Sequence, residues 1–165
     1  MAVEERSYPI RTNAVFRDVR SRQVMDAILA VHFPEGSILD CTWGKGAFWS
    51  EQNKHRVIGA DLAPRNGCMI GADVRHLPFP DKFFDVAVFD PPHLHNIGTH
   101  SDLALGDDFS FLSSQKEIHK LIIAAMPEIA RVSKEGAIIK FTDMVESGRW
   151  NPTHIMAAAS VAPTF

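Results

Sequence analysis

Hydrophobic residues recur along this chain with two different spacings, and each spacing predicts one kind of element. Between residues 20 and 32 the apolar positions fall on one helical face, and Phe33-Pro34-Glu35-Gly36 then ends the helix. A second helical pattern follows a capping box at residues 114–117, and we expect this helix to bend at Pro127. The apolar positions of this second pattern are Ile118, Leu121, Ile122, Ala125 and Ile129.

Short apolar runs without helical spacing predict strands at residues 37–41, 56–60, 68–72, 84–89 and 137–141. The first run leads into a glycine-containing turn and then, we expect, a helix over residues 47–52. Asn151-Pro152 predicts the start of a last helix, and residues 93–108 predict a long loop. This alternation predicts an α/β fold with a doubly wound, mostly parallel, Rossmann-like sheet. Ligands of such sheets bind beyond the carboxyl ends of the strands.

Length and composition agree with one globular domain. The chain has 165 residues, 45% of them hydrophobic and 22% charged, which predicts a domain over residues 20–165 after an N-terminal arm over residues 1–19. No apolar run is long enough to cross a bilayer, and the charged N-terminus does not resemble a signal peptide, so we expect a cytoplasmic protein. Cys41 and Cys68 lie in apolar stretches and predict buried, reduced thiols.

The charge of the chain limits how it can bind nucleic acid. A formal net charge of -3 argues against tight, nonspecific binding, which depends on cationic groups that displace counterions from phosphates. Arginines are nevertheless concentrated near the N-terminus, where they favour either a solvated arm or a segment that lies against a phosphate backbone. They are Arg6, Arg11, Arg17, Arg20 and Arg22.

Two glycines follow the first predicted strand, where the chain must turn sharply and let a ligand approach its backbone. Gly44 and Gly46 fit either a dinucleotide fold or a fold that binds S-adenosylmethionine (SAM). The dinucleotide motif requires a small residue at position 49, but this chain has Trp49 there. A fold that binds SAM usually has an acidic residue before the glycines, and this chain has Asp40. The turn therefore favours SAM.

Carboxylates also end the next two predicted strands. Asp61 has the spacing expected of an acid that accepts hydrogen bonds from both ribose hydroxyls, and Leu62 beside it belongs to the predicted cofactor site. Asp73 could accept a hydrogen bond from the adenine amino group while the Val74 backbone contacts the ring edge. The alternative is that each is an ordinary aspartate of a strand-end turn.

With these motifs in order, the chain resembles the class I SAM-dependent methyltransferases, and more narrowly the amino-methyltransferases of nucleic-acid bases with a D/N-P-P-Y/F loop. The resemblance covers roughly residues 24–141 and includes Asp90-Pro91-Pro92-His93 after the fourth predicted strand. It implies a cofactor site and an acceptor site. The implied cofactor residues are Asp40, Thr42, Trp43, Gly44, Gly46, Asp61, Leu62, Asp73, Val74 and Asp90, and the implied catalytic residues are Asp90, Pro91, Pro92 and His93.

The acceptor loop suits a reaction on an exocyclic base amine, whose lone pair is delocalised into the ring. The Asp90 carboxylate and the Pro91 carbonyl can both accept hydrogen bonds from such an amine and orient its lone pair toward the methyl group. His93 stands where the family has a stacking aromatic residue, which leaves DNA, RNA and small planar amines open as acceptors. The alternative is a rigid turn without chemistry.

Other readings remain open at this point. His93, His95 and His100 lie close in sequence, but no acidic or cysteine ligand set accompanies them, so we predict no metal site.

A complete fold of the family has two further strands, so we expect a form shortened at its C-terminal end. Without a target-recognition domain, a sequence-specific DNA enzyme would need a specificity partner, an oligomer such as a homodimer, or the long loop to read bases. A SAM-binding subunit without catalysis and a nicotinamide-dependent dehydrogenase are the rival functions.

Overall fold

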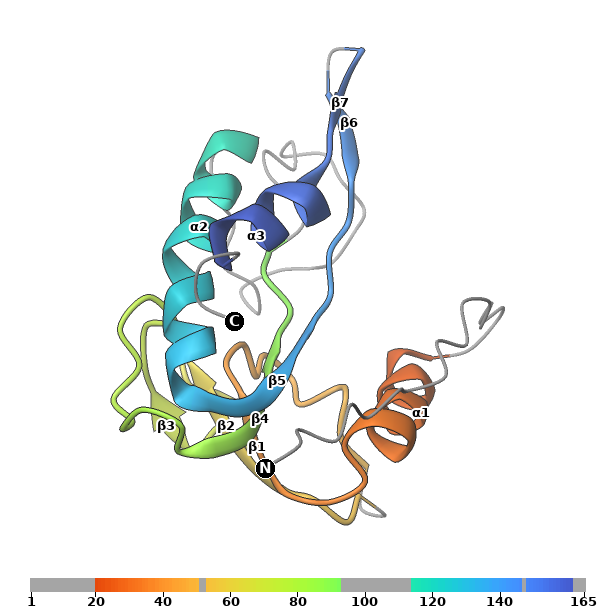
Figure 1. The fold of residues 1–165 in the computed structure, drawn as a ribbon, viewed down its shortest axis with the longest axis vertical. Helices are drawn as coiled ribbons and strands as arrows, with labels where there is room; N and C mark the ends of the chain where they lie inside the picture. Colours follow the sequence, from red (N-terminus) through yellow and green to blue (C-terminus); the bar gives the residue numbers. More distant parts are fainter. Residues whose placement is uncertain (1–19, 51–52, 93–113, 147, 162–165) are drawn as a thin grey trace, which may run out of the picture.

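The computed structural model describes residues 20–50, 53–92, 114–146 and 148–161 (Figure 1). Its centre is a five-stranded sheet in the order β3-β2-β1-β4-β5, in which every neighbouring pair of strands is parallel. The strands are β1 (Ser37–Asp40), β2 (Arg56–Asp61), β3 (Ile70–Gly71), β4 (Phe84–Phe89) and β5 (Ser133–Ile139). The predicted doubly wound α/β fold is therefore confirmed. The chain adds β2 and β3 on one side of β1 and then adds β4 and β5 on its other side, so the strand order switches between β1 and β4. Ligands of open α/β sheets bind at such a switch point.

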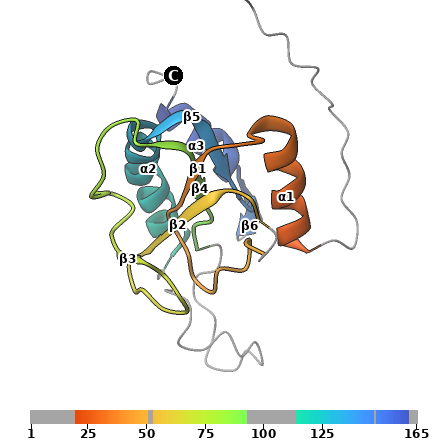
Figure 2. The same cartoon turned by 90° about the horizontal axis from the view of Figure 1, so that it is seen from below.

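Helices lie on both faces of the sheet (Figure 2). On one face, α1 (Ser21–His32) contributes Met25 and Leu29 to an apolar cluster with Ile38, Val86 and Val88 of the strands. On the other face, α2 (Gln115–Val132) packs its apolar side against the larger core of the molecule. The sheet is therefore buried on both faces, which explains why its strands are continuous apolar runs.

The helix predicted over residues 47–52 is wrong for residues 47–50, which form turns. Phe48 and Trp49 of this segment instead pack against the cluster on the α1 side of the sheet. Trp49 also donates a hydrogen bond from Nε1 to Oδ2 of Asp40, at 2.7 Å. These tertiary contacts cover a face that a helix would otherwise cover, and they outweigh the weak local preference for a helix.

The remaining element predictions agree with the structure within a few residues. The capping interaction at the start of α2 is present, since the Ser114 hydroxyl accepts from the Glu117 amide, and the helix continues through Pro127. β3 has two residues instead of the predicted five, because this edge strand pairs only with Ala60 and Asp61 at the end of β2. Short edge strands leave few backbone groups unpaired.

After β5 the chain forms an antiparallel hairpin and a last helix. The hairpin consists of β6 (Met144–Glu146) and β7 (Arg149–Asn151), and α3 (Thr153–Val161) follows it and lies beside α2 (Figure 1). The predicted start of this helix at Asn151-Pro152 is thus correct to within two residues. Both thiols are free; the predicted burial is confirmed for Cys41, whereas Cys68 is only half-buried. Within the described ranges, none of the helices combines the length and apolar character that a bilayer-spanning helix needs. The arm predicted over residues 1–19 and the loop predicted over residues 93–108 lie outside the described residues.

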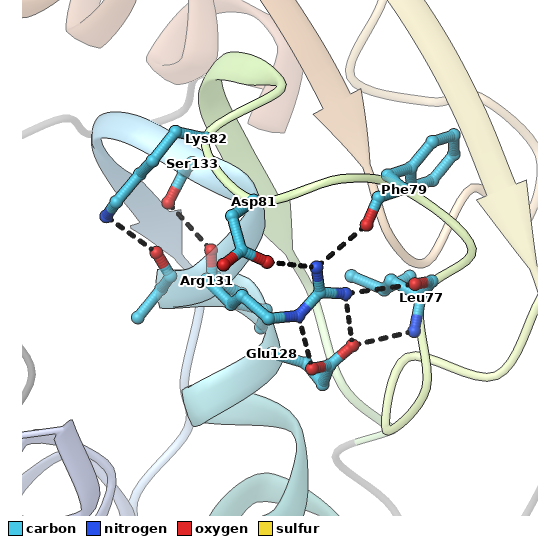
Figure 3. A network of polar contacts seen from close by, with 9 residues as sticks. Leu77, Phe79, Asp81, Lys82, Glu128, Arg131 and Ser133 are labelled. Atoms are coloured by element: carbon cyan, nitrogen blue, oxygen red, sulfur yellow. Dashed lines mark hydrogen bonds and ion pairs between the residues drawn. The ribbon is translucent and has the colours of Figure 1, made fainter.

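Several hydrogen bonds attach the connection between β3 and β4 to the end of α2, and many of them come from the Arg131 side chain (Figure 3). The Arg131 guanidinium donates to the Glu128 carboxylate at 2.7 and 2.8 Å and to the Asp81 carboxylate at 2.8 Å. It also donates to the backbone carbonyls of Leu77 and Phe79, at 3.0 and 2.8 Å. These hydrogen bonds hold the strand connection that follows Asp73 against the helix.

Candidate active site

The glycine turn joins the carboxyl ends of β1 and β2. Gly44 and Gly46 have φ angles of 52° and 65°, in the left-handed region that favours glycine. The Gly44 amide donates to Oδ2 of Asp61 at 2.9 Å, so the turn after β1 is tied to the residue that ends β2. The sequence therefore predicted correctly that this turn needs glycine.

Trp43, which directly precedes Gly44, packs its ring against Gly59 of β2 and against Gly46. Its ring occupies the space that a side chain at Gly59 or Gly46 would need, so both glycines are required by this one tryptophan. The Trp43 indole Nε1 donates to the Asn66 carbonyl at 3.0 Å. Gly59 is the residue in this contact that sequence reasoning missed, because a glycine inside a strand signals close packing without identifying the partner.

Asp40, at the end of β1, is a buried carboxyl. Only 1% of the residue is exposed, and its oxygens accept hydrogen bonds from the Trp49 indole and the Thr42 amide. Burial raises the pKa of Asp40 from its usual 3.8 to about 6, although the hydrogen bond from Trp49 opposes this rise. The nearby charges of Asp90 and Asp61 raise the pKa further. A cationic ligand group placed beside Asp40 would offset this cost.

Asp61, the predicted ribose ligand, is half-buried at the end of β2. Its two oxygens accept from backbone amides, one from Gly44 at 2.9 Å and one from Ala63 at 3.0 Å. Each carboxylate oxygen has a further lone pair, so these bonds leave capacity for hydroxyl donors. Leu62 beside it is 66% exposed, which makes an apolar surface available next to the carboxylate.

Asp73 and Val74 are the predicted adenine contacts, and the side chains of both contact other residues of the chain. The Arg75 side chain binds Asp73 through both carboxylate oxygens, at 2.6 to 3.1 Å, and this hydrogen bonding lowers the pKa of Asp73 to about 2. The Val74 side chain is buried in the core. The Arg75 partner was not predicted, although its position two residues after Asp73 was the available signal.

The proline corner lies directly beside the glycine turn. The Asp90 amide donates to Oγ1 of Thr42 at 2.8 Å, which joins the exit of β4 to the turn after β1. Pro91 is fully buried and Pro92 is half-buried, whereas His93 lies outside the described residues. A threonine hydroxyl therefore links the two segments that sequence reasoning assigned to the cofactor and to the acceptor.

Lys140 is a component of the site that the sequence analysis did not single out. It follows β5, and its Nζ lies 2.8 Å from Oδ2 of Asp90. The same ammonium lies 5.5 Å from the centre of the Phe48 ring. A cation at the end of an apolar strand was the available signal, but the sequence does not show which carboxylate it faces.

Asp40, Asp61 and Asp90 therefore converge at the switch point of the sheet. Asp61 and Asp90 are both close enough to raise the pKa of Asp40 electrostatically. Asp73 has Arg75 as its main electrostatic partner instead. The arrangement places a group of partly buried carboxylates next to a rigid corner, which suits a ligand with both cationic and hydrogen-bonding groups.

The parallel sheet with helices on both faces defines a Rossmann-like α/β domain. No family model and no curated protein matches the sequence. The chain is similar in fold to the PH0226 protein from Pyrococcus horikoshii OT3, whose crystal structure aligns with a TM-score of 0.51 and 22% sequence identity. The alignment covers 73% of this chain and 56% of that protein, so the chain spans just over half the length of this neighbour. At this identity the similarity supports the fold alone.

Proposed function

We propose that this chain is a SAM-dependent methyltransferase that transfers a methyl group to an exocyclic amino nitrogen of a nucleobase in DNA or RNA, of the adenine N6 or cytosine N4 type. The observation that carries this proposal is the hydrogen bond from the Asp90 amide to Thr42. This bond keeps the proline corner next to the glycine turn, as methyl transfer between two adjacent ligands requires. A corner that faced away from the turn would have left no site for the reaction.

The residues at the carboxyl ends of β1 and β2 fit the chemical groups of SAM. Asp40 is a buried carboxylate that benefits from a cationic neighbour, and the amino acid end of SAM carries an ammonium group. Asp61 has acceptor capacity for the two ribose hydroxyls, and Leu62 provides apolar surface beside it. The bound cofactor would supply an activated methyl group on a positively charged sulfur.

The proline corner fits an amino group that must be oriented. The Asp90 carboxylate and the Pro91 carbonyl would accept its two N–H hydrogens and direct the nitrogen lone pair toward the methyl group. Two consecutive prolines restrict the backbone here, so these acceptors need little reorganisation. We expect Asp90 to act mainly through position and to take up the released proton late or pass it to water.

Methyl transfer from labelled SAM to separate DNA, RNA and nucleoside pools tests the proposal. Asp90→Ala should lower incorporation on the preferred pool by about 100-fold or more, because it removes a hydrogen bond that strengthens in the transition state. Calorimetry should show that the variant keeps most of its SAM affinity, because Asp40 and Asp61 remain in place, and that the wild type prefers SAM to NAD. Asp85→Asn is the matched control, since Asp85 lies at the opposite end of the same strand. Equal incorporation by the wild type and Asp90→Ala would remove Asp90 from the mechanism.

The net charge of -3 favours a second candidate, a small-molecule N-methyltransferase that uses the same site. Incorporation into free nucleosides or other planar amines, without incorporation into polymers, would identify it. SAM binding with no incorporation on any pool would instead indicate a non-catalytic SAM-binding subunit.

A further inference from the structure

Lys140 is held at the proline corner by its backbone and by its side chain. The Lys140 amide donates to the Phe89 carbonyl at 3.0 Å, which aligns the residue with the end of β4. Its ammonium then forms the 2.8 Å ion pair with Asp90 and lies over the Phe48 ring. A cation over an aromatic face gains electrostatic stabilisation. The backbone hydrogen bond to Phe89 and the contact with the Phe48 ring therefore both hold the lysine in place beside Asp90.

The three carboxylates at the switch point differ in how their charges are compensated. Asp40 and Asp61 accept hydrogen bonds from uncharged groups, which are the Trp49 indole and backbone amides. Asp90 has a full positive charge beside it. The two carboxylates proposed to face the cofactor thus lack a cationic partner among these contacts, whereas the carboxylate proposed to face the acceptor forms an ion pair.

We propose that Lys140 is a positioning residue that orients the Asp90 carboxylate and offsets its charge, so that the acceptor site selects a neutral planar amine over a cationic alkylammonium. This inference rests on the proposed methyltransferase function. A neutral base amine needs only hydrogen-bond acceptors, which a paired carboxylate still supplies. An alkylammonium needs an unpaired negative charge, and it would be repelled by the Lys140 ammonium.

The chain offers a matched control for this lysine. Lys134 forms an ion pair with Asp85 at 2.9 Å, at the opposite end of the same two neighbouring strands. The two ion pairs are nearly equally exposed. The exposed fractions of the side chains are 48% for Lys140 and 21% for Asp90. They are 49% for Lys134 and 24% for Asp85. Removing either lysine should therefore have a similar small effect on folding.

The test compares the full chain with Lys140→Met, Lys140→Arg and Lys134→Met. Each protein is assayed with labelled SAM and two acceptors, the preferred nucleobase substrate and the polyamine spermidine. Lys140→Met should lower kcat for the nucleobase by about tenfold or more and shift the preference toward spermidine by a similar factor. Lys140→Arg should restore most of the preference, and Lys134→Met should stay within about twofold of the wild type. Calorimetry should give a SAM Kd for Lys140→Met within about threefold of the wild-type value.

The outcomes separate this inference from the function on which it rests. Methyl transfer by the wild type with an unchanged acceptor preference in Lys140→Met would overturn the role of Lys140 alone. An equal loss in Lys134→Met would also overturn it, because the effect would then come from general destabilisation. If the wild type transferred no methyl group to any acceptor, both proposals would fail together.

Discussion

Replacing Asp40 by asparagine tests the energetic cost of the carboxyl group buried at the end of β1. Burial raises the pKa of this group from its usual 3.8 to about 6 in the folded protein. Because the folded pKa is the higher one, the native state binds more protons than the unfolded state between these two values. The stability contributed by the neutral carboxyl is therefore present below pH 3.8 and is lost as the pH rises through about 6.

The size of this effect follows from the two pKa values. A change from 3.8 to about 6 corresponds to about 3 kcal/mol in total, at about 1.4 kcal/mol for each pKa unit. About 2 kcal/mol of this loss should fall between about pH 4.5 and about pH 7. Asparagine has nearly the same shape and does not ionise, so the variant should lack this part of the pH dependence.

Urea unfolding at a series of pH values measures the prediction. The free energy of unfolding of Asp40→Asn minus that of the wild type should increase by about 2 kcal/mol from about pH 4.5 to about pH 7. The substitution also replaces one hydrogen-bond acceptor by an amide, but the cost of this change is the same at both pH values and therefore does not affect the increase. Asp85→Asn is the control, because hydrogen bonds from Ser37 lower the pKa of Asp85 to about 2, below the measured range. A difference for Asp40→Asn that stays constant with pH would refute the reasoning.

Two further substitutions test contacts that support the site. Gly59→Ala should destabilise the chain by about 1–3 kcal/mol, because the new methyl group would overlap the Trp43 ring. In a Trp43→Ala background the same change should cost less than about 1 kcal/mol in a double-mutant cycle, and additive costs would contradict the contact. Arg131→Met should cost about 1–3 kcal/mol in urea unfolding, since the partly buried carbonyls of Leu77 and Phe79 lose their donor. Arg131→Lys should recover only a small part of this loss, because an ammonium cannot reproduce the planar fork; full recovery would argue against that geometry.

The order of elements could be predicted from the sequence because it depends on local patterns. β4 matches its prediction at both ends, since a six-residue apolar run stops at Asp90-Pro91-Pro92, which cannot continue a ladder. The glycines of the first turn were also predictable, because their positive φ angles depend on residue type. The prediction failed at residues 47–50, where aromatic packing onto the sheet replaced a helix.

The sequence by itself determined which residues stand at the carboxyl ends of the strands, because alternation of apolar runs and polar breaks is a property of neighbouring positions. Only the tertiary structure decided the partners of Asp90, which meets Thr42 and Lys140. These contacts join residues 48 and 50 positions apart, and strand order and register bring them together. Asp73 differs, because its partner Arg75 lies only two positions away in the chain. Local pattern carries no information about the pairings of Asp90, because they are selected by the packing of the whole sheet.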